Sequence, residues 1–575
     1  MNSSMGRMDA DPVKIAASLR EIAGYLWLEG ESFRARAYQR AAAIVESAPE
    51  LERLIREARL TSLPRIGPAL AGTITALAGT GTASVLEKLR VRWPSALIEL
   101  QSLPGLGAEK ARVLHERLGI NSIDELAEAC TLGRVRDLPG FGARSEQNLA
   151  EAIATRGDRP PPALLLPQAR EMATSLQRHL AACHAAVRTS VAGEVRRWLE
   201  TAHRLDLAVA THDPAAVRAH LERHPMVLAV AEEDEERARV TLVTGTAAAL
   251  HTAPPERWGV TLARATGAEA HWQKLVARAA ARGIDLDRFA AADEREVYAA
   301  VGLPYLPPEV RDGDDELDAA DVGSLDDRLV EPGDVRGAVH CHTVHSDGKA
   351  TIEEMALAAV ELGFEYLTIT DHSASAHYAG GLTLERLRQQ WNEIDEVQQR
   401  VGIRLFKGTE ADILADGALD WPDTVLEQLD VVIASVHQRH KLDEDEMTRR
   451  LVRAMRLPVF KIWGHALGRL IGRREPFKCH VEEVLDAIAA APAAIEINGD
   501  PHRLDLEPRW ARRASERGIR FVLASDAHST GALSCVEYAV AMARRARLRP
   551  EEVLNTLSAD AFARAVKPKR GLRAA

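Results

Sequence analysis

The strongest constraint on the fold is a series of seven short β-rich runs, from residue 336 onward, that alternate with helical stretches. The runs are GAVHCHT, EYLTITDH, LFKGTEADI, VVIASVH, VFKIWGH, AIEING and FVLASDAH. Alternation of strands with helices favours a βα barrel. In barrels of this kind, the chemistry lies at the carboxyl ends of the strands.

Residue types that bind metals gather at those expected strand ends. They are His340, His342, Asp347, Asp371, His372, Glu410, His437, His465, Asp526 and His528. Imidazole and carboxylate together suit Zn²⁺, Mn²⁺ or Fe²⁺. Because strand side chains alternate, the two histidines of H-x-H point the same way and can share one ion. One such histidine alone is usually a satisfied core or loop residue, but their recurrence at matching strand ends indicates a metal centre.

The motifs H-x-H, T-D-H, a glutamate after a strand, single histidines at strand ends and S-D-A-H resemble the PHP (polymerase and histidinol phosphatase) superfamily. The resemblance implies up to three divalent metals, Mn²⁺ and/or Zn²⁺ with Fe²⁺ possible, bound by His340, His342, Asp347, His372, Glu410, His437, His465, Asp526 and His528. It also implies that Asp371 orients ligands, and that Arg503 and Arg469 contact the substrate phosphate. The implied reaction is metal-assisted phosphoester hydrolysis.

One pattern occurs three times in the first third of the chain, as LPRIG from Leu63, LPGLG from Leu103 and LPGFG from Leu138. Glycine lets the backbone turn tightly and approach a ligand, and the free N–H groups of the following helix can bind a phosphate oxygen. Glycine and proline can also merely punctuate helix connections, but three copies favour a repeat. The pattern resembles the helix-hairpin-helix motif, which holds DNA without reading its sequence. The residues expected at DNA are Gly67, Gly105, Gly107, Lys110, Gly140 and Gly142.

The segment GEVRRWLETAHRLDLAV resembles the palm signature of X-family DNA polymerases, and the matching residues are Gly193, Arg196, Arg197, Glu200, Thr201 and Asp206. Three positions depart from that signature. Glu194 replaces a serine, Arg204 replaces an aspartate, and Thr241 is the best match to the third carboxylate. Two-metal phosphoryl transfer needs carboxylates that hold two cations about 4 Å apart. We therefore expect the palm to have lost its metal site, with Glu194 opposing an incoming triphosphate.

Composition restricts the partners and the cellular location expected for the protein. The net charge of −11 does not favour nucleic acid, but DNA binding depends on local patches rather than totals. Five scattered cysteines without a C-x-x-C pair do not support a disulfide framework. No window approaches about 20 consecutive apolar residues, so no membrane span is expected. The expected location is the cytoplasm, with the nucleoid when the protein is on DNA, and the oligomeric state is left open.

The order of these parts is the order seen in bacterial and archaeal X-family polymerases. We expect a multidomain α/β protein with a helical helix-hairpin-helix N-terminal region, a polymerase X-type palm and thumb, and a C-terminal distorted (β/α)₇ PHP barrel. The expected divisions are a helical domain at 1–90, hairpin repeats at 91–160, palm and thumb at 161–312, an acidic linker at 313–334 and the PHP domain at 335–575.

The resemblance implies a metal-dependent 3′→5′ exonuclease of base-excision repair that acts on gapped or 3′-ended DNA of any sequence, beside an impaired polymerase. One alternative is an active gap-filling polymerase with proofreading by the PHP domain, and a second is a small-molecule phosphatase. A non-catalytic DNA-repair scaffold is a third. Arg204 and Thr241 argue against the polymerase, the hairpin repeats against the phosphatase, and the full ligand set against the scaffold.

Overall fold

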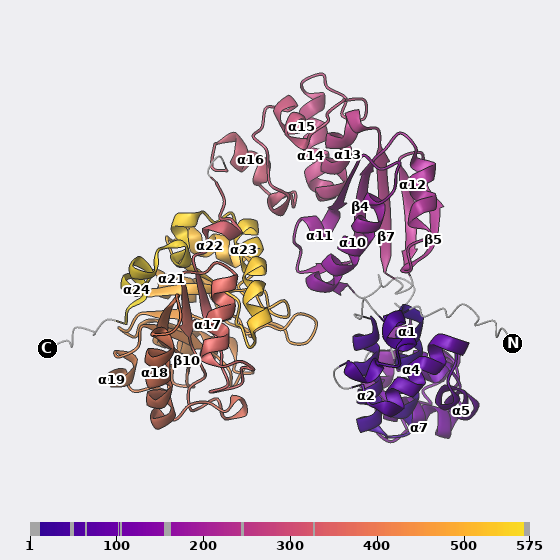
Figure 1. The fold of residues 1–575 in the computed structure, drawn as a ribbon, viewed down its shortest axis with the longest axis horizontal. Coiled ribbons are helices and arrows are strands. Elements are labelled where there is room, and N and C mark those ends of the chain that lie inside the picture. Colours follow the sequence, from indigo (N-terminus) through magenta and orange to yellow (C-terminus); the bar gives the residue numbers. More distant parts are fainter. Residues whose placement is uncertain are drawn as a thin grey trace. The chain divides into compact units, whose positions relative to one another are not determined.

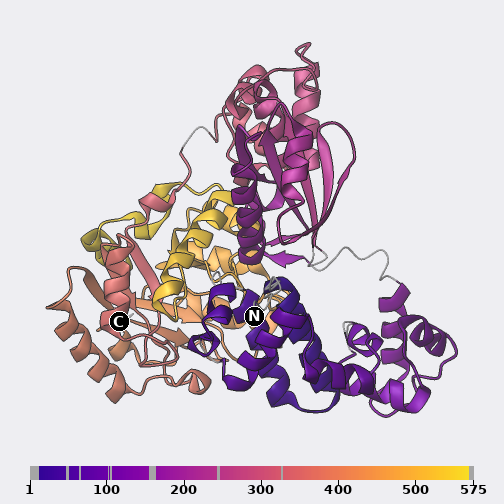
Figure 2. The ribbon, with the colours of Figure 1, turned by 45° about the vertical axis from the view of Figure 1, so that its right-hand side comes forward.

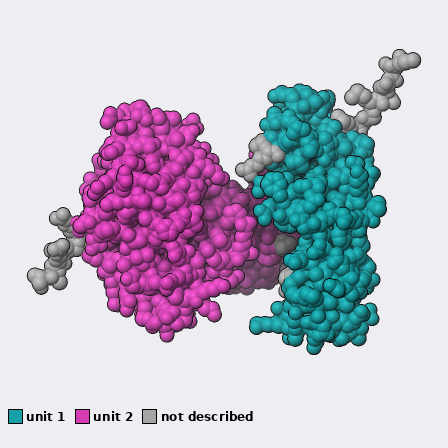
Figure 3. Space-filling view, turned by 90° about the horizontal axis from the view of Figure 1, so that it is seen from below, with its two compact units in different colours: residues 1–162, 222–229, 241–246 teal, residues 163–221, 230–240, 247–575 magenta. Residues whose placement is uncertain are grey.

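The computed structural model describes residues 12–46, 51–63, 66–101, 103, 106–154, 163–242, 246–325 and 328–568. The chain divides into two compact units, which Figure 3 colours separately. One unit comprises residues 1–162, 222–229 and 241–246, and the other comprises residues 163–221, 230–240 and 247–575. The five cysteines are all free thiols, as the sequence predicts.

The first unit is built from helices around one apolar core (Figure 2). Its helices are α1 Pro12–Leu28, α2 Ser32–Glu46, α3 Leu51–Arg56, η1 Leu60–Ser62, α4 Pro68–Thr80, α5 Ser84–Arg92, α6 Ala96–Leu100, α7 Ala108–Leu118, α8 Ile123–Thr131 and α9 Ala143–Ala154. Ile15, Leu19, Ile22 and Leu26 recur at helical spacing on α1 and are buried in that core. This single apolar stripe explains why the segment is a packed helix.

The three repeated turns precede α4, α7 and α9, as the sequence predicts. Gly67 and Gly107 are the N-cap residues of α4 and α7, without a side-chain cap. Gly142 stands directly before α9, and Gly140 needs its glycine because its φ is +81°. A Cβ placed on any of these four glycines meets no atom within 4 Å among the described residues, so a ligand has room there. Gly105, the remaining predicted glycine, lies outside the described residues.

After the N-terminal helices the chain forms a sheet region (Figure 1). Its elements are β1 Leu164–Leu165, α10 Leu166–Ala181, β2 Arg188–Ala192, α11 Gly193–Arg196, β3 Thr201–Ala202, β4 Arg204–Ala210, α12 Pro214–Leu221, β5 Val227–Glu232, β6 Arg237–Leu242, β7 Ala247–Ala253, η2 Pro255–Arg257, α13 Trp258–Thr266, α14 Glu269–Ala280, α15 Glu294–Ala300 and η3 Pro308–Val310. The sheet order is β2-β4-β7-β6-β5, with β2 antiparallel and β7 parallel to β4. Trp258 and Leu262 of α13 cover the alanines of β4 and form a small core with them.

The stretch 313–334, expected to be an acidic linker, contains a packed helix, α16 (Glu316–Asp321). Leu317 and Ala320 belong to the same apolar core as α14 and α15. Glu316 is fully buried and accepts a hydrogen bond of 2.6 Å from His271 Nδ1. Part of the predicted linker is therefore fixed on the thumb side of the palm by apolar burial and a paired acid.

The βα barrel prediction is confirmed. The strands are β8 Gly337–Cys341, β9 Tyr366–Ile369, β10 Arg404–Asp412, β11 Val431–Ser435, β12 Lys461–Trp463, β13 Ala493–Asn498 and β14 Phe521–Ala524. They form one parallel sheet in chain order, and a bridge between Cys341 and Ala527 brings the first and last strands together. These strands are buried almost throughout, as expected when helices cover a barrel.

The connections between the strands carry the other elements of the barrel. They are η4 Pro332–Asp334, α17 Ile352–Glu361, η5 His377–Ala379, α18 Leu384–Gln398, α19 Asp423–Leu426, α20 Glu444–Met455, α21 Val481–Ala489, α22 Pro508–Ser515, η6 Thr530–Cys535, α23 Val536–Arg545, η7 Pro550–Glu552, η8 Leu554–Thr556 and α24 Ala559–Val566. Among the described residues no single helix is long and apolar enough to cross a bilayer, and only α4 and α5 together, with an 85° bend, meet that test of length and composition.

Candidate metal centre

All nine predicted ligands lie around one mouth of the barrel, at or after the carboxyl ends of its strands. His340 lies on β8, His342 and Asp347 follow it, Glu410 lies within β10, and the others follow β9, β11, β12 and β14. Three of the nine, His340, His465 and Asp526, have positive φ values of 63°, 24° and 50°. Such backbone conformations are costly for residues with a side chain and gather at functional sites. The fold thus holds these three side chains in orientations that ordinary strand geometry does not give.

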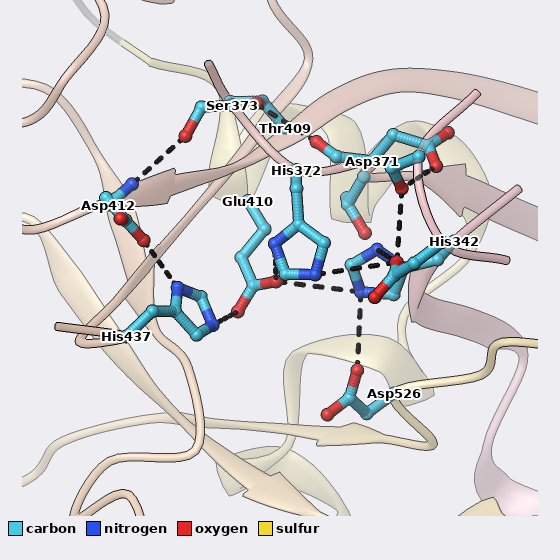
Figure 4. Close-up of polar contacts among 12 residues, drawn as sticks. His342, Asp371, His372, Ser373, Thr409, Glu410, Asp412, His437 and Asp526 are labelled. Carbon is cyan, nitrogen blue, oxygen red and sulfur yellow. Dashed lines mark hydrogen bonds and ion pairs between the residues drawn. The ribbon is translucent and has the colours of Figure 1, made fainter. Parts of the chain in front are cut away.

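Glu410 is the centre of the cluster, and Figure 4 shows its carboxylate between His437 and His372. Its Oε1 lies 3.3 Å from His437 Nε2 and 2.8 Å from His465 Nε2. Its Oε2 lies 3.0 Å from His372 Nδ1, and the rings of His340 and His342 approach it to 3.4 and 3.6 Å. One buried carboxylate therefore faces five imidazoles.

The possible ligand atoms form three overlapping groups, each within 4.8 Å. The groups are His342, Asp347, His372 and His528; His340, His342 and Asp526; and His372, Glu410 and His437. His342 and His372 each belong to two of them, so neighbouring ions would share ligands. His465 joins the last group through Glu410. The arrangement brings together every residue that the sequence assigned to the metal centre.

The donor atoms fit divalent cations. Within the described part of the chain, His340 Nε2, both ring nitrogens of His342, His372 Nδ1 and His465 Nδ1 are buried without a hydrogen-bond partner. Buried polar atoms are nearly always satisfied in folded proteins. Burial would raise the pKa of Glu410, yet the charges of His437 and His340 hold it well below its ordinary value. Ionised carboxylates beside unpaired imidazole nitrogens are the ligands that Zn²⁺ and Mn²⁺ accept.

Two carboxylates that the sequence analysis missed hold the histidine rings in place. Glu496 on β13 accepts a 2.5 Å hydrogen bond from His340 Nδ1, and Asp412 at the end of β10 accepts one from His437 Nδ1. Each bond fixes which ring nitrogen faces the cluster. The only signal in the sequence is an acid inside an otherwise apolar buried strand, as in AIEING. Asn498 donates to both Glu496 and Asp526, which ties these two acids together.

Asp371 lies beside the cluster rather than in it. It accepts hydrogen bonds from Thr343 N at 2.8 Å, Thr343 Oγ1 at 2.6 Å and Gln390 Nε2 at 2.6 Å. The two bonds from Thr343 hold the loop that follows β8 and carries Asp347, and Gln390 of α18 anchors Asp371 itself. The role of Asp371 in orienting ligands stays a prediction.

The two arginines expected at the substrate phosphate lie in different environments. Arg503 Nε is 3.4 Å from Asp526 Oδ2, and its Nε and Nη1 have no hydrogen-bond partner among the described residues. Arg469 is buried, and its Nη1 and Nη2 donate to Glu200 at 3.0 and 2.7 Å. The structure contradicts the predicted phosphate contact of Arg469, because its N–H groups are already used, and leaves Arg503 as the candidate.

In the palm, protein side chains already balance the charge of Asp206. Arg204 Nε donates to both oxygens of Asp206, at 3.0 and 3.1 Å, and His251 Nε2 donates to Oδ1 at 2.9 Å. Burial alone would raise the pKa of Asp206, but the His251 hydrogen bond and the Arg204 charge lower it. A guanidinium thus occupies the place beside Asp206 where a metal ion would need a second carboxylate.

The prediction that Thr241 marks the third carboxylate position is wrong. Thr241 lies on β6, and the sheet order places β7 between β4 and β6. The residue in register with Asp206 on the neighbouring strand is Ala249. Ala249 is therefore the position on the neighbouring strand directly beside Asp206, and its side chain has no ligand atom.

The remaining palm residues line a cavity of about 450 Å³. Gly193 has φ +61°, and a Cβ there would lie 2.3 Å from Asp206 Oδ2, so only glycine fits. Glu194 accepts a hydrogen bond from His203 N at 2.6 Å while lining the cavity. Arg197 donates to Thr266 O at 2.5 Å and lies 3.3 Å from Asp312. The acids that line this cavity, Asp206 and Glu194, thus already have protein partners. The negative charge of Glu194 would also repel an anion.

Three family models match the chain: a PHP domain over residues 338–500, a helix-hairpin-helix domain over 12–83 and a SAM-like helix-hairpin-helix tandem over 97–155. The chain is 34% identical over 559 residues to the DNA polymerase/3′-5′ exonuclease PolX of Bacillus subtilis, covering 94% of this chain and 96% of that protein. It is 30% identical over 243 residues to a probable phosphatase of Caldanaerobacter subterraneus, covering 40% of this chain and 91% of that protein.

Divalent metal should stabilise the barrel, because ions bind the assembled cluster and not the unfolded chain. Mn²⁺ at about 100 times its dissociation constant adds about 2.7 kcal/mol, which corresponds to about 5–10 °C in the Tm of the barrel. Differential scanning calorimetry with Mn²⁺ and with EDTA measures the shift. The His342→Ala variant should lose most of it, whereas His480→Ala, which removes an exposed barrel histidine, should keep it. Equal shifts in the two variants would contradict the site.

Carboxylates restored at the correct palm positions should create a new cation site. Arg204→Asp combined with Ala249→Asp places three acids on adjacent strands, so Mn²⁺ titration by calorimetry should show added binding relative to the unmodified protein. The matched control is Arg204→Asp with Thr241→Asp, which introduces the same charges but places one acid a strand further away. Equal metal binding by the two double variants would show that Ala249 does not hold the third position.

Proposed function

This chain belongs to the PolX family, and we propose that it acts on DNA 3′ ends as a metal-dependent 3′→5′ exonuclease while its polymerase site is inactive. The observation that carries the proposal is the contrast between its two sites. The barrel mouth gathers six histidines and three carboxylates with unpaired ring nitrogens. The palm pairs its one remaining carboxylate, Asp206, with Arg204 and His251.

In the proposed site, the nine barrel residues hold up to three divalent cations, Mn²⁺ and/or Zn²⁺ or Fe²⁺. Bound metals supply Lewis-acid activation of water and charge neutralisation in phosphoester hydrolysis. Glu496 and Asp412 keep the rings of His340 and His437 turned toward the cluster. The Arg503 Nε and Nη1 groups, which make no hydrogen bond to the described residues, offset charge on the non-bridging phosphate oxygens.

The hairpin repeats hold the DNA in this proposal. The N-termini of α4, α7 and α9 each begin at a glycine with open space around it, and such termini bind phosphate oxygens. Lys110, on the first turn of α7, lies with Nζ 5.1 Å from the centre of the Phe141 ring. Helix N-termini and lysines contact the phosphate backbone of DNA, so this binding is independent of the DNA sequence. Gapped or 3′-ended DNA, as produced in base-excision repair, is the proposed substrate.

The proposed division of labour follows the domain limits expected from the sequence, with the helical domain at 1–90, hairpin repeats at 91–160, palm and thumb at 161–312 and PHP domain at 335–575. A gap-filling polymerase would require metals where Arg204 stands. A small-molecule phosphatase agrees with the similarity of the barrel to the probable phosphatase of Caldanaerobacter subterraneus, but gives no role to the hairpin repeats matched by two family models.

One assay separates these activities. With 5′-labelled gapped DNA and Mn²⁺, the protein should shorten the 3′ end, and added dNTPs should produce no extension. His342→Ala should abolish the shortening, because His342 belongs to two of the three ligand groups, whereas His480→Ala should not change it. Product lengths are measured on a denaturing gel. Extension by one base or more would refute the inactive palm, and shortening that survives in His342→Ala would refute the barrel as its source.

The hairpin turns should lose DNA affinity when their glycines gain a side chain. Gly107→Ala adds a methyl group into open space with φ at −72°, so the fold is unaffected while a phosphate can no longer approach. The dissociation constant should rise about tenfold, the value of a lost charged hydrogen bond. Gly72→Ala is the matched control, since its Cβ is also unobstructed but lies inside α4. Fluorescence anisotropy measures both, and equal affinities would exclude this turn from DNA.

A further inference from the structure

Arg469 joins the palm to the barrel through a bidentate ion pair. Its two terminal nitrogens donate to the two oxygens of Glu200 at 3.0 and 2.7 Å. Only 5% of Arg469 is exposed. Glu200 follows α11 in the palm signature, whereas Arg469 follows β12 near the ligand His465. An ion pair of this geometry and burial fixes both partners more firmly than a surface pair does.

The same guanidinium holds the barrel loop that carries Arg503. Arg469 Nε donates to the carbonyl oxygen of Arg503 at 2.8 Å, and Nη2 donates to the carbonyl oxygen of Leu504. The backbone N–H of Arg503 donates to the Asp500 carbonyl oxygen at 2.8 Å, which closes a tight turn. Arg469 thus connects Glu200 directly to the backbone of the residue whose side chain faces the metal cluster.

Two further acids lie near Arg469, so the direction in which its guanidinium points depends on Glu200. Glu507 lies 3.3 Å from Arg469 Nη1, and Asp505 accepts from the Arg469 backbone N–H at 3.3 Å. Without the Glu200 carboxylate, the guanidinium would keep a counter-ion in Glu507 and could turn toward it. That rotation would weaken its bonds to the carbonyls of residues 503 and 504. Loss of Glu200 is therefore expected to displace the loop rather than to unfold the barrel.

The palm segment before Glu200 is itself held on the barrel. Trp198 packs against Tyr538 of α23 with ring centres 5.6 Å apart, and Arg170 lies 3.5 Å above the Trp198 ring. Arg545 of α23 donates to the Arg197 carbonyl oxygen at 2.9 Å. The Glu200 backbone oxygen accepts from Leu166 N at 3.1 Å. Glu200 thus reaches Arg469 from a fixed position.

We propose that Glu200 of the palm is a positioning residue for the nuclease site, acting through Arg469 to aim Arg503 at the substrate phosphate. The inference rests on the proposed exonuclease function and gives the metal-free palm a part in it. Glu200 touches neither substrate nor metal. Its effect depends on Arg503, which separates it from a residue that merely stabilises the fold.

The test compares Glu200→Gln with Glu232→Gln in the full-length, Mn²⁺-loaded protein. Glu232 is the matched control because it pairs with another palm arginine, Arg218, at 3.0 Å. Exonuclease kcat and KM, inorganic phosphate affinity and Mn²⁺ affinity are measured, the affinities by calorimetry. Glu200→Gln should lower kcat and weaken phosphate binding, each by about tenfold, the size of a lost charged hydrogen bond. Mn²⁺ affinity should not change, and Glu232→Gln should match the unmodified protein.

The decisive arm repeats Glu200→Gln in an Arg503→Ala background. If Glu200 acts by aiming Arg503, the second substitution should cause no further loss of kcat or of phosphate affinity. Losses that multiply, or a Glu200→Gln variant equal to Glu232→Gln, would overturn the inference. An unmodified protein without Mn²⁺-dependent shortening would instead defeat the proposed exonuclease, and phosphate affinity would still decide whether Glu200 positions Arg503.

Discussion

The burial of the Glu410 carboxylate among five imidazoles is the interaction on which the barrel mouth depends. A buried carboxylate is costly unless positive charge surrounds it. The ring nitrogens that face Glu410 supply that charge only when they carry protons or share cations, and those of His340, His342 and His372 make no hydrogen bond in the described chain. Glu496 and Asp412 turn the His340 and His437 rings so that their second nitrogens point inward. Hydrogen bonds within the protein thus fix the orientation of the rings whose nitrogens would bind cations.

The palm also contains a buried carboxylate whose charge must be balanced, but there protein side chains balance it. Asp206 is as deeply buried as Glu410, but its charge is balanced within the protein by the Arg204 guanidinium and the His251 ring. Once a fixed cation satisfies the carboxylate, a mobile one gains little there. Ala249 removes the other side of the site, since the strand beside Asp206 offers only a methyl group in register with it. The palm therefore has its sheet and cavity, but Asp206 needs no metal ion to balance its charge.

Sequence reasoning was accurate where function follows local pattern and failed where it follows tertiary neighbours. The barrel and the gathering of its nine candidate ligands could be predicted because these residues lie near the carboxyl ends of strands or in the loops that follow, and parallel strands bring those ends together. Glu496 escaped notice because an acid in a strand interior has no periodic signal, and its partner His340 is 156 residues away in the chain. The strand-like run RVTLVTG points to Thr241 as the third carboxylate position, whereas the sheet places β7, and not the β6 strand of Thr241, beside β4. Arg469 resembled a phosphate ligand by position, but Glu200, 269 residues earlier, binds its guanidinium.

The Glu200–Arg469 pair gives the palm a structural role beside the nuclease site that does not depend on metal binding in the palm. The residues of its signature divide by the direction they face. Glu194, Arg204 and Asp206 line the palm cavity, whereas Glu200 and the carbonyl of Arg197 contact the barrel. Two of the departures from the polymerase signature, Glu194 and Arg204, thus line the cavity, whereas Glu200 still matches the signature. Because Arg469 uses its guanidinium for Glu200 and for the Arg503 loop at once, a change in the palm at this point reaches the nuclease site through one side chain. A palm that no longer binds metal can therefore still set the geometry of phosphate binding in the barrel.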